Sequence, residues 1–273
     1  MFEQIVLGTI QGITEWIPVS SKACVIAAKA YLFHRTNPYN ELINYALLLH
    51  LGTLGAAIIY FRKDLGLILE SVSRPSDKNK DSAKILMFLL ITTTLTGLGL
   101  ILTKKVDALT HAAPNAKLAL TLIIGLALAI AGLLQLKTSS AGKRTPGDLN
   151  TIDGIILGLA QAVATLPGLS RAGTTMAMLS LRGFEKENML KLSFLMSMPA
   201  IFIGNIVLNY KSFLHAGIEW VGVLTAFIVG LLSISTLMNV ARRVNFGKFL
   251  IFIGIILICS VALTFFSPMK FID

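Results

Sequence analysis

The chain has 273 residues, of which 55% are hydrophobic and only 14% are charged. Soluble domains carry nearer to a quarter charged residues, so this composition excludes an ordinary soluble protein and indicates a polytopic membrane protein in one bundle. The formal net charge of +10 would suit a nucleic-acid-binding protein, but in a membrane protein the excess of Lys and Arg marks cytoplasmic loops. We therefore expect membrane lipids as partners and no nucleic acid.

The first apolar segment, residues 4–33, is interrupted near its middle by polar residues and a proline. Its centre reads GITEWIPVSSKAC over residues 12–24. Each half is too short to cross the hydrocarbon core, which needs about 20 residues. Irregular backbone at membrane depth is tolerated only where it is buried in protein or lines a wet cavity. The segment is therefore predicted to form a re-entrant helix–loop–helix.

The rest of the chain repeats this arrangement of one broken segment and three uninterrupted ones. A second broken segment covers residues 152–181. The uninterrupted apolar runs, each long enough to span a bilayer, are 42–61, 85–103, 118–136, 192–210, 218–239 and 249–267. The pattern predicts an all-α polytopic membrane protein with six transmembrane helices and two re-entrant segments.

The two broken segments also resemble each other in sequence, over residues 5–27 and 155–177. The matching positions, with a one-residue gap before the proline, are Ile5, Leu7, Gly8, Gln11, Pro18, Ser21, Lys22 and Ala23 with Ile155, Leu157, Gly158, Gln161, Pro167, Ser170, Arg171 and Ala172. Three spans follow each copy, and an odd number of crossings places the second copy upside down. We expect a single membrane domain, 1–273, with one repeat at 1–140 and an inverted one at 150–270, and with the two loop tips meeting near the midplane.

Loop charges predict the orientation. If both broken segments are re-entrant, one side of the membrane collects Arg62, Lys63, Arg74, Lys78, Lys80, Lys84, Lys137, Lys143, Arg144, Arg182, Lys186, Lys191, Arg242, Arg243 and Lys248. The other side collects Arg35, Lys104, Lys105, Lys117, Lys211 and Lys270. By the positive-inside rule the first side is cytoplasmic and both termini lie outside.

Polar residues at the first tip are candidates for a functional site. Gln11 and Glu15 are four residues apart and share one helix face. An ionisable group inside a membrane is costly and is a functional candidate by default. Of Ser20 and Ser21, one is expected to cap the following helix, while the other projects its hydroxyl into the cavity, beside backbone N–H groups that favour an anion.

Two cations face these residues from equivalent positions in the repeat, Lys22 and Arg171. Buried cations beside helix N-termini favour a phosphate group, and the planar guanidinium suits phosphate oxygens. The second tip adds a glycine that permits close backbone approach, together with hydroxyl groups. These further candidates for substrate binding are Gly168, Ser170, Thr174 and Thr175.

Other reactive side chains are fewer. His50 lies inside a predicted span, where it could orient a ligand or move a proton. Cys24 lies one turn beyond the serines. No His or Cys cluster has zinc-site spacing, but a hard divalent ion, Mg²⁺ or Ca²⁺, held by Glu15 and a diphosphate is compatible with the sequence.

At these residues the sequence resembles the undecaprenyl-diphosphatase family, the BacA-type membrane phosphatases linked to bacitracin resistance. The first motif is the stretch from Gln11 to Cys24, QGITEWIPVSSKAC, and the second is the stretch from Pro167 to Thr175, PGLSRAGTT. The resemblance covers essentially the whole chain. It implies interdigitated inverted repeats in the cell (inner) membrane and an active site open to the outer face.

The resemblance implies removal of the terminal phosphate of undecaprenyl diphosphate, which recycles the lipid carrier for peptidoglycan and other envelope glycans. Arg171, Lys22 and loop N–H groups would hold the phosphates. Glu15 with Gln11 would hold a divalent metal or act as a base, and Ser21 would be the nucleophile or a phosphate ligand. Ser170 and Thr175 would be supporting donors. A homodimer is left open.

Two departures from the family pattern keep other functions open. Cys24 stands where the family usually has a histidine, after Lys22-Ala23 in place of Thr-Gly, and Ala172 replaces the second serine of the arginine motif. Cys24 or His50 would then have to compensate. The alternatives are a flippase or another anion transporter, since inverted repeats with broken helices are common in transporters, and a non-catalytic binder of polyprenyl phosphate.

Overall fold

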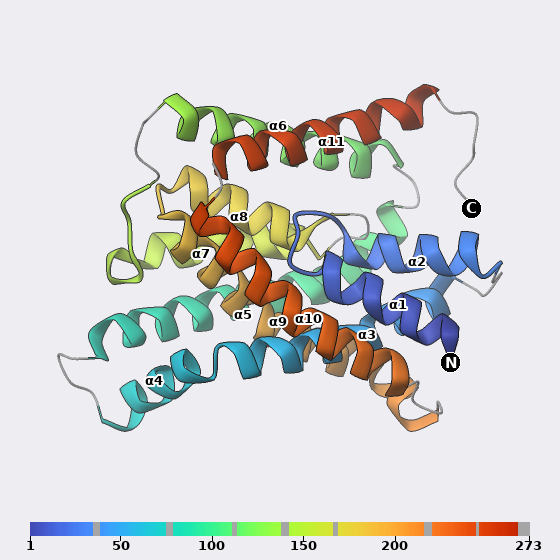
Figure 1. The fold of residues 1–273 in the computed structure, drawn as a ribbon, viewed down its shortest axis with the longest axis horizontal. Helices are drawn as coiled ribbons and strands as arrows, with labels where there is room; N and C mark the ends of the chain where they lie inside the picture. The colour runs from blue at the N-terminus through green and yellow to red at the C-terminus, as the bar shows by residue number, and fades with distance from the viewer. Residues whose placement is uncertain are drawn as a thin grey trace.

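The computed structural model describes residues 1–34, 39–74, 79–110, 114–137, 142–165, 169–215, 220–243 and 246–266. Within these ranges the chain is helical, with no β-strand and one isolated bridge between Arg144 and Phe184. Figure 1 shows the arrangement. The helices are α1 (Phe2–Thr14), α2 (Ser21–Leu32), α3 (Tyr39–Tyr60), α4 (Arg62–Ser73), α5 (Lys80–Thr110), α6 (Pro114–Lys137), α7 (Thr151–Val163), α8 (Arg171–Leu181), α9 (Lys186–His215), α10 (Trp220–Arg243) and α11 (Phe246–Phe266), with a 3₁₀ turn η2 at Pro146–Asp148.

Both segments predicted to be broken contain two short helices, and residues 166–168 between the second pair lie outside the described residues. α1 and α2 have 13 and 12 residues, and α7 and α8 have 13 and 11. At 1.5 Å per residue none of them reaches across a 30 Å hydrocarbon core. In each segment the first helix therefore ends within the stretch where the sequence predicted a break, after Thr14 and after Val163.

Four helices are long and apolar enough to cross a membrane, with windows at Glu41–Tyr60, Lys80–Ile101, Lys186–Ile206 and Trp220–Val240. They confirm four of the predicted spans and make this a membrane protein. The other two predicted spans fall on α6 and α11, which lie side by side along one edge of the molecule (Figure 1). Their apolar windows in the described residues are shorter. The sequence did not predict the amphipathic helix α4.

The first helix of each short pair packs chiefly against a helix from the opposite half of the chain. α1 lies on α10, and α7 lies on α5. Glycines permit this contact, because a Cβ atom at Gly8 would lie 2.4 Å from the carbonyl oxygen of Gly222, and one at Gly158 would lie 2.8 Å from Leu95 Cδ1. Small residues at such crossings let helix backbones approach closely. Neither half could therefore bury its own first helix alone.

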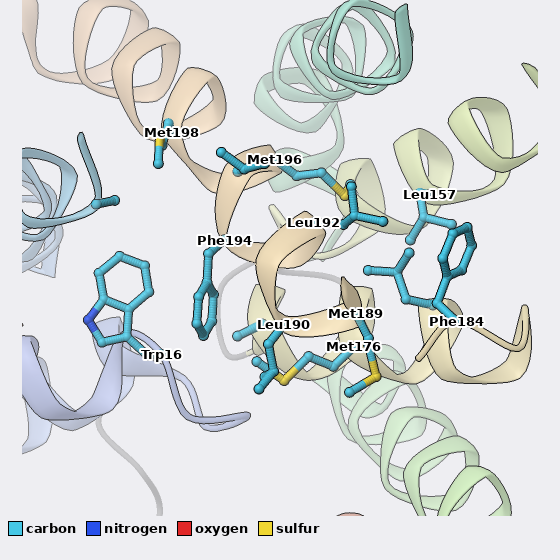
Figure 2. Close-up of a cluster of buried hydrophobic side chains, with 14 of the residues drawn as sticks. Trp16, Leu157, Met176, Phe184, Met189, Leu190, Leu192, Phe194, Met196 and Met198 are labelled. Carbon is cyan, nitrogen blue, oxygen red and sulfur yellow. The ribbon is translucent and has the colours of Figure 1, made fainter. Parts of the chain in front are cut away.

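The central core lies along α9 (Figure 2). Trp16, in the turn between α1 and α2, is fully buried, and its ring meets the Phe194 ring edge-on at 5.0 Å. Its indole N–H donates to the Gly230 carbonyl oxygen at 3.1 Å. A buried indole normally finds such a partner. This residue therefore fixes the first tip to α9 and α10.

A buried carboxylate joins the outer ends of α7 and α8. Asp153 accepts from Arg144 at 2.5 Å and 3.0 Å and from Arg182 at 2.7 Å. Burial of this carboxylate raises its pKa, but the hydrogen bonds from the two guanidinium groups and from the Asn150 backbone outweigh that effect and hold the pKa below its ordinary value. The legs of the second tip are thus held together by charge.

Candidate active site

A cavity of about 100 Å³ opens between the two tips. The tips touch each other, since a Cβ atom on Gly173 at the start of α8 would lie 3.3 Å from Pro18 Cβ in the first turn. Glu15, Ser21, Lys22 and Arg171 all line this cavity. The prediction that an acidic group of one tip meets a guanidinium group of the other is therefore confirmed geometrically.

Glu15 is the centre of the polar cluster and is only 4% exposed. One carboxylate oxygen, Oε1, pairs with the Arg171 guanidinium. The other, Oε2, accepts from Gln11 Nε2 at 2.7 Å and from Ser21 Oγ at 2.8 Å. Gln11 and Glu15, which were predicted to share one helix face, are thus joined by a direct hydrogen bond. A buried carboxylate with several donors stays ionised and holds its partners in place.

As predicted, one of the two serines caps α2 and the other points its hydroxyl into the cavity. The Ser20 hydroxyl accepts from the backbone N–H of Ala23 and caps α2. Ser21, the first residue of α2, is 8% exposed and points its hydroxyl at Glu15. In the second tip the cap is Ser170, whose hydroxyl accepts from the Gly173 N–H at 3.1 Å. Ser170 is therefore bound to its own helix, although it also lines the cavity.

Lys22 adds a second cationic side chain to the cavity. It interacts electrostatically with both Glu15 and Arg171. Two cationic side chains and one carboxylate give the site an excess of positive charge, and the N-termini of α2 and α8, whose first N–H groups have no intrahelical partner, lie at the same cavity. Such a site favours an anion.

His50 enters the polar cluster from α3, outside both tips. Its side chain is buried, and Nε2 lies 3.2 Å from Glu15 Oε2 and 3.4 Å from Ser21 Oγ. Cys24, by contrast, is half-buried on α2 and is not among the residues that line the cavity. The structure therefore brings only one of the two compensating candidates into the site.

The remaining candidates of the second tip are placed differently. Thr174 and Thr175 are buried and do not line the cavity. Thr174 donates to the Ser170 carbonyl at 2.9 Å, and Thr175 lies 2.6 Å from the Ser193 hydroxyl of α9. Both hydroxyls thus stabilise α8 and its packing. Gly168 lies outside the described residues.

Sequence reasoning missed polar groups that approach the cavity from the long helices. Asn205 of α9 lines it, with a buried amide oxygen that has no hydrogen-bond partner in the part of the chain that the structure describes. Thr96 of α5 also lines it and accepts from Gln161 at 2.9 Å. A polar side chain inside an apolar run was the available signal for both. The face of the helix that each occupies could not be read without the partner helices.

The cavity has few protein oxygen ligands to offer a divalent ion. The described residues contain no cluster of three His, Cys, Asp or Glu side chains. Both oxygens of Glu15 already accept hydrogen bonds from the Gln11, Ser21 and Arg171 side chains. Mg²⁺ and Ca²⁺ require several oxygen ligands, so this carboxylate does not fit the role of their main protein ligand.

The sequence was compared with known proteins. The profile of the family described as "Bacitracin resistance protein BacA" matches residues 4–259. A protein named undecaprenyl-diphosphatase from Methanococcoides burtonii is 35% identical, over 96% of this chain and 98% of its own. Proteins of the same name from Haloarcula marismortui and Desulfosudis oleivorans are 36% and 31% identical, over 89% and 91% of this chain and 90% and 92% of their own.

Proposed function

The chain belongs to the bacitracin resistance protein BacA family and is a membrane phosphatase of that family, and we propose that it hydrolyses undecaprenyl diphosphate, or another polyprenyl diphosphate, to the monophosphate and inorganic phosphate. The reaction returns the lipid carrier to the synthesis of peptidoglycan and other envelope glycans. The names of the relatives support the substrate class. The site supports the chemistry.

One observation carries the proposal. Inside one cavity, Glu15 accepts a hydrogen bond from Ser21 of its own tip and pairs with the Arg171 guanidinium of the other tip. A hydroxyl held beside a guanidinium is the pair that phosphoryl transfer requires, because a nucleophile must approach a phosphorus whose oxygens are neutralised. In this proposal Ser21 attacks the terminal phosphorus. Glu15 positions the hydroxyl and the cation.

Arg171 and Lys22 bind the phosphate oxygens, with backbone N–H groups at the starts of α2 and α8. Arg171 can turn from Glu15 to the substrate because a diphosphate carries more charge than one carboxylate. Gln11 orients Glu15, and Ser20 and Ser170 cap the helices that present these N–H groups. Thr174 and Thr175 support α8 from behind.

The remainder of the cavity wall suits an isoprenoid. Its apolar lining residues include Leu47, Leu100, Leu169, Ala200 and Ile201. A prenyl chain gains about 0.8 kcal/mol for each buried CH₂ group. The polar headgroup then reaches the tips, while the tail leaves between the helices toward lipid.

For the membrane arrangement we propose six spans and two re-entrant segments, in inverted repeats at 1–140 and 150–270. The paired short helices with the same serine cap support the repeat, and the packing of α1 on α10 and of α7 on α5 supports interlocked halves. Loop charges support cytoplasmic basic loops, with both termini and the cavity opening on the outer face of the cell membrane. A homodimer is compatible with this arrangement.

For the divalent cation we propose that Mg²⁺ or Ca²⁺ is carried chiefly by the diphosphate oxygens. The Gln11 amide oxygen, which has no hydrogen-bond partner among the described residues, is a spare protein ligand next to Glu15. The ion would neutralise phosphate charge when bound. No role of the protein residues described above depends on it.

The test is phosphate release from farnesyl or undecaprenyl diphosphate by the purified full-length protein in detergent with added Mg²⁺ or Ca²⁺. We expect turnover, and we expect Glu15→Gln to reduce it by about 10³-fold. The matched control is Glu3→Gln, on the same helix but at its exposed end, which should leave turnover unchanged. A wild-type protein that binds the monophosphate without hydrolysing the diphosphate would instead be a flippase or a non-catalytic binder.

A further inference from the structure

A backbone contact fixes which ring nitrogen of His50 carries the hydrogen. Its Nδ1 atom lies 2.6 Å from the carbonyl oxygen of Ala46, one turn earlier in α3. A carbonyl oxygen can only accept, so Nδ1 carries a hydrogen. In the neutral ring, Nε2 is then the nitrogen with the free lone pair.

That free nitrogen faces the reacting hydroxyl. Nε2 lies 3.4 Å from Ser21 Oγ and 3.2 Å from Glu15 Oε2, and these two oxygens are 2.8 Å apart. The three atoms form a compact triangle in which a proton can move over one short step. The ring is buried, which fixes its orientation.

The other groups at the site are poorly suited to accept the Ser21 proton. The Ser21 hydroxyl donates to Glu15 Oε2 in the structure, but a protonated Glu15 would be a weaker acceptor for Gln11 and could no longer stabilise a cation beside it. Lys22 and Arg171 are proton donors rather than acceptors. Cys24 does not line the cavity.

We propose, on the basis of the function proposed above, that His50 is the catalytic acid and base of the reaction, supplied from α3 rather than from either tip. In the first step Ser21 Oγ bonds to the terminal phosphorus, and its proton moves to Nε2. The bond from that phosphorus to the bridging oxygen breaks, and the polyprenyl monophosphate leaves with the bonding electron pair.

In the second step a water oxygen bonds to the phosphorus and the phosphorus–Oγ bond breaks, releasing inorganic phosphate. The imidazolium returns its proton to Oγ, and the freed imidazole takes the proton that water loses and passes it to solvent. The sum is one diphosphate and one water converted to two phosphates and one proton. Glu15 stabilises the imidazolium formed in the first step. Lys22 and Arg171, the other charged groups near the ring, oppose this effect by electrostatic repulsion.

The test compares His50→Gln, His50→Ala and Cys24→Ala in the full-length protein with farnesyl diphosphate. We expect His50→Gln to lower kcat by about 10²–10³-fold with KM within about threefold, because general acid–base catalysis contributes that much. Added imidazole should restore turnover to His50→Ala in proportion to its concentration, which a purely structural role would not produce. Cys24→Ala should retain wild-type turnover.

The outcomes separate this inference from the function on which it rests. Wild-type protein without turnover overturns both. Active wild type with a kcat for His50→Gln less than about tenfold lower overturns the role of His50 alone. Folding of each variant is checked by size exclusion, and His50→Asn, whose amide N–H can still reach the Ala46 carbonyl, replaces a variant that fails this check.

Discussion

The two tips are built alike but carry different chemistry. Each has a serine cap one residue before its second helix, Ser20 before α2 and Ser170 before α8. Cap position therefore makes Ser21 the counterpart of Arg171, both being the first residue of a helix. The hydroxyl bonds one oxygen of Glu15 and the guanidinium pairs with the other. The same backbone position presents a hydroxyl group in one tip and a cation in the other.

This pairing corrects the predicted alignment, which matched Lys22 with Arg171 after a one-residue gap. The structure needs no gap, because Gln11 and Gln161 are separated from the two caps by the same number of residues. The shared proline, rather than the caps, had forced the gap. The lesson is that a capping residue, which fixes backbone geometry, is a better anchor for such an alignment than a proline in the turn.

A single carboxylate breaks the symmetry. Gln11 donates to Glu15, whereas Gln161 donates to Thr96 of α5. The residue that corresponds to Glu15 is Thr165, whose hydroxyl turns back to the Ala162 carbonyl at 2.7 Å. The repeat thus supplies one acidic centre that both tips share.

Replacing Ser21 gives the largest expected difference between the tips. Ser21→Ala should lower kcat by about 10³-fold or more, because it removes the nucleophile. Ser20→Ala on the same turn should leave kcat within a fewfold. Turnover of both proteins on farnesyl diphosphate checks this, and a loss of only about tenfold for Ser21→Ala would reduce its role to that of a phosphate ligand.

The guanidinium of the second tip comes next. Arg171→Lys keeps the charge but loses the planar fork, so kcat/KM should fall by about 10²-fold. Arg182→Lys, at the far end of α8, is the matched control and should retain activity. Steady-state kinetics of the two variants decide the point, and equal values for both would contradict the proposed phosphate contact.

The charged pairs near the starts of α1 and α7 should contribute differently to the stability of the protein. Asp153→Asn leaves Arg144 and Arg182 without their buried partner and should lower Tm by about 5 °C at neutral pH. Glu3→Gln, in the corresponding place on α1, weakens a 3.8 Å pair with Lys29 between partly exposed side chains and should change Tm less.

The effect at Asp153 depends on pH in a stated direction. Its pKa is held below the ordinary value of about 3.9, so its stabilisation is present above that pH and is lost as pH falls through the folded-state pKa. The Tm difference between wild type and Asp153→Asn should therefore shrink below about pH 4. A thermal melt series over pH measures this, and a difference that grows in acid would contradict it.

The caps give the smallest expected effect and the closest similarity. Ser20→Ala and Ser170→Ala should each cost about 1 kcal/mol of stability, or a Tm shift of about 2–4 °C. The two losses should be equal within error if the caps are equivalent. Thermal melts of both variants in the same detergent test it.

Much of this arrangement could be predicted from local sequence. Short polar interruptions in apolar runs located both tips, and the spacing of Gln11 and Glu15 gave their hydrogen bond. Long-range placement could not be predicted in the same way. His50 was visible inside a span, but only the packing of α3 beside the first tip turns its ring to Ser21. The helix α4 was missed because its apolar face is short.

The crossing of α1 on α10 bears on how the protein is made. The N-terminal helix meets its glycine-lined partner around Gly222, a residue that the ribosome adds only after most of the chain has been translated. Until then the first tip can contact α3 but lacks α10, the helix against which α1 packs most extensively. Biogenesis of this protein must therefore end with a late closing event, and a chain truncated before α10 would leave its first hairpin unassembled in the bilayer.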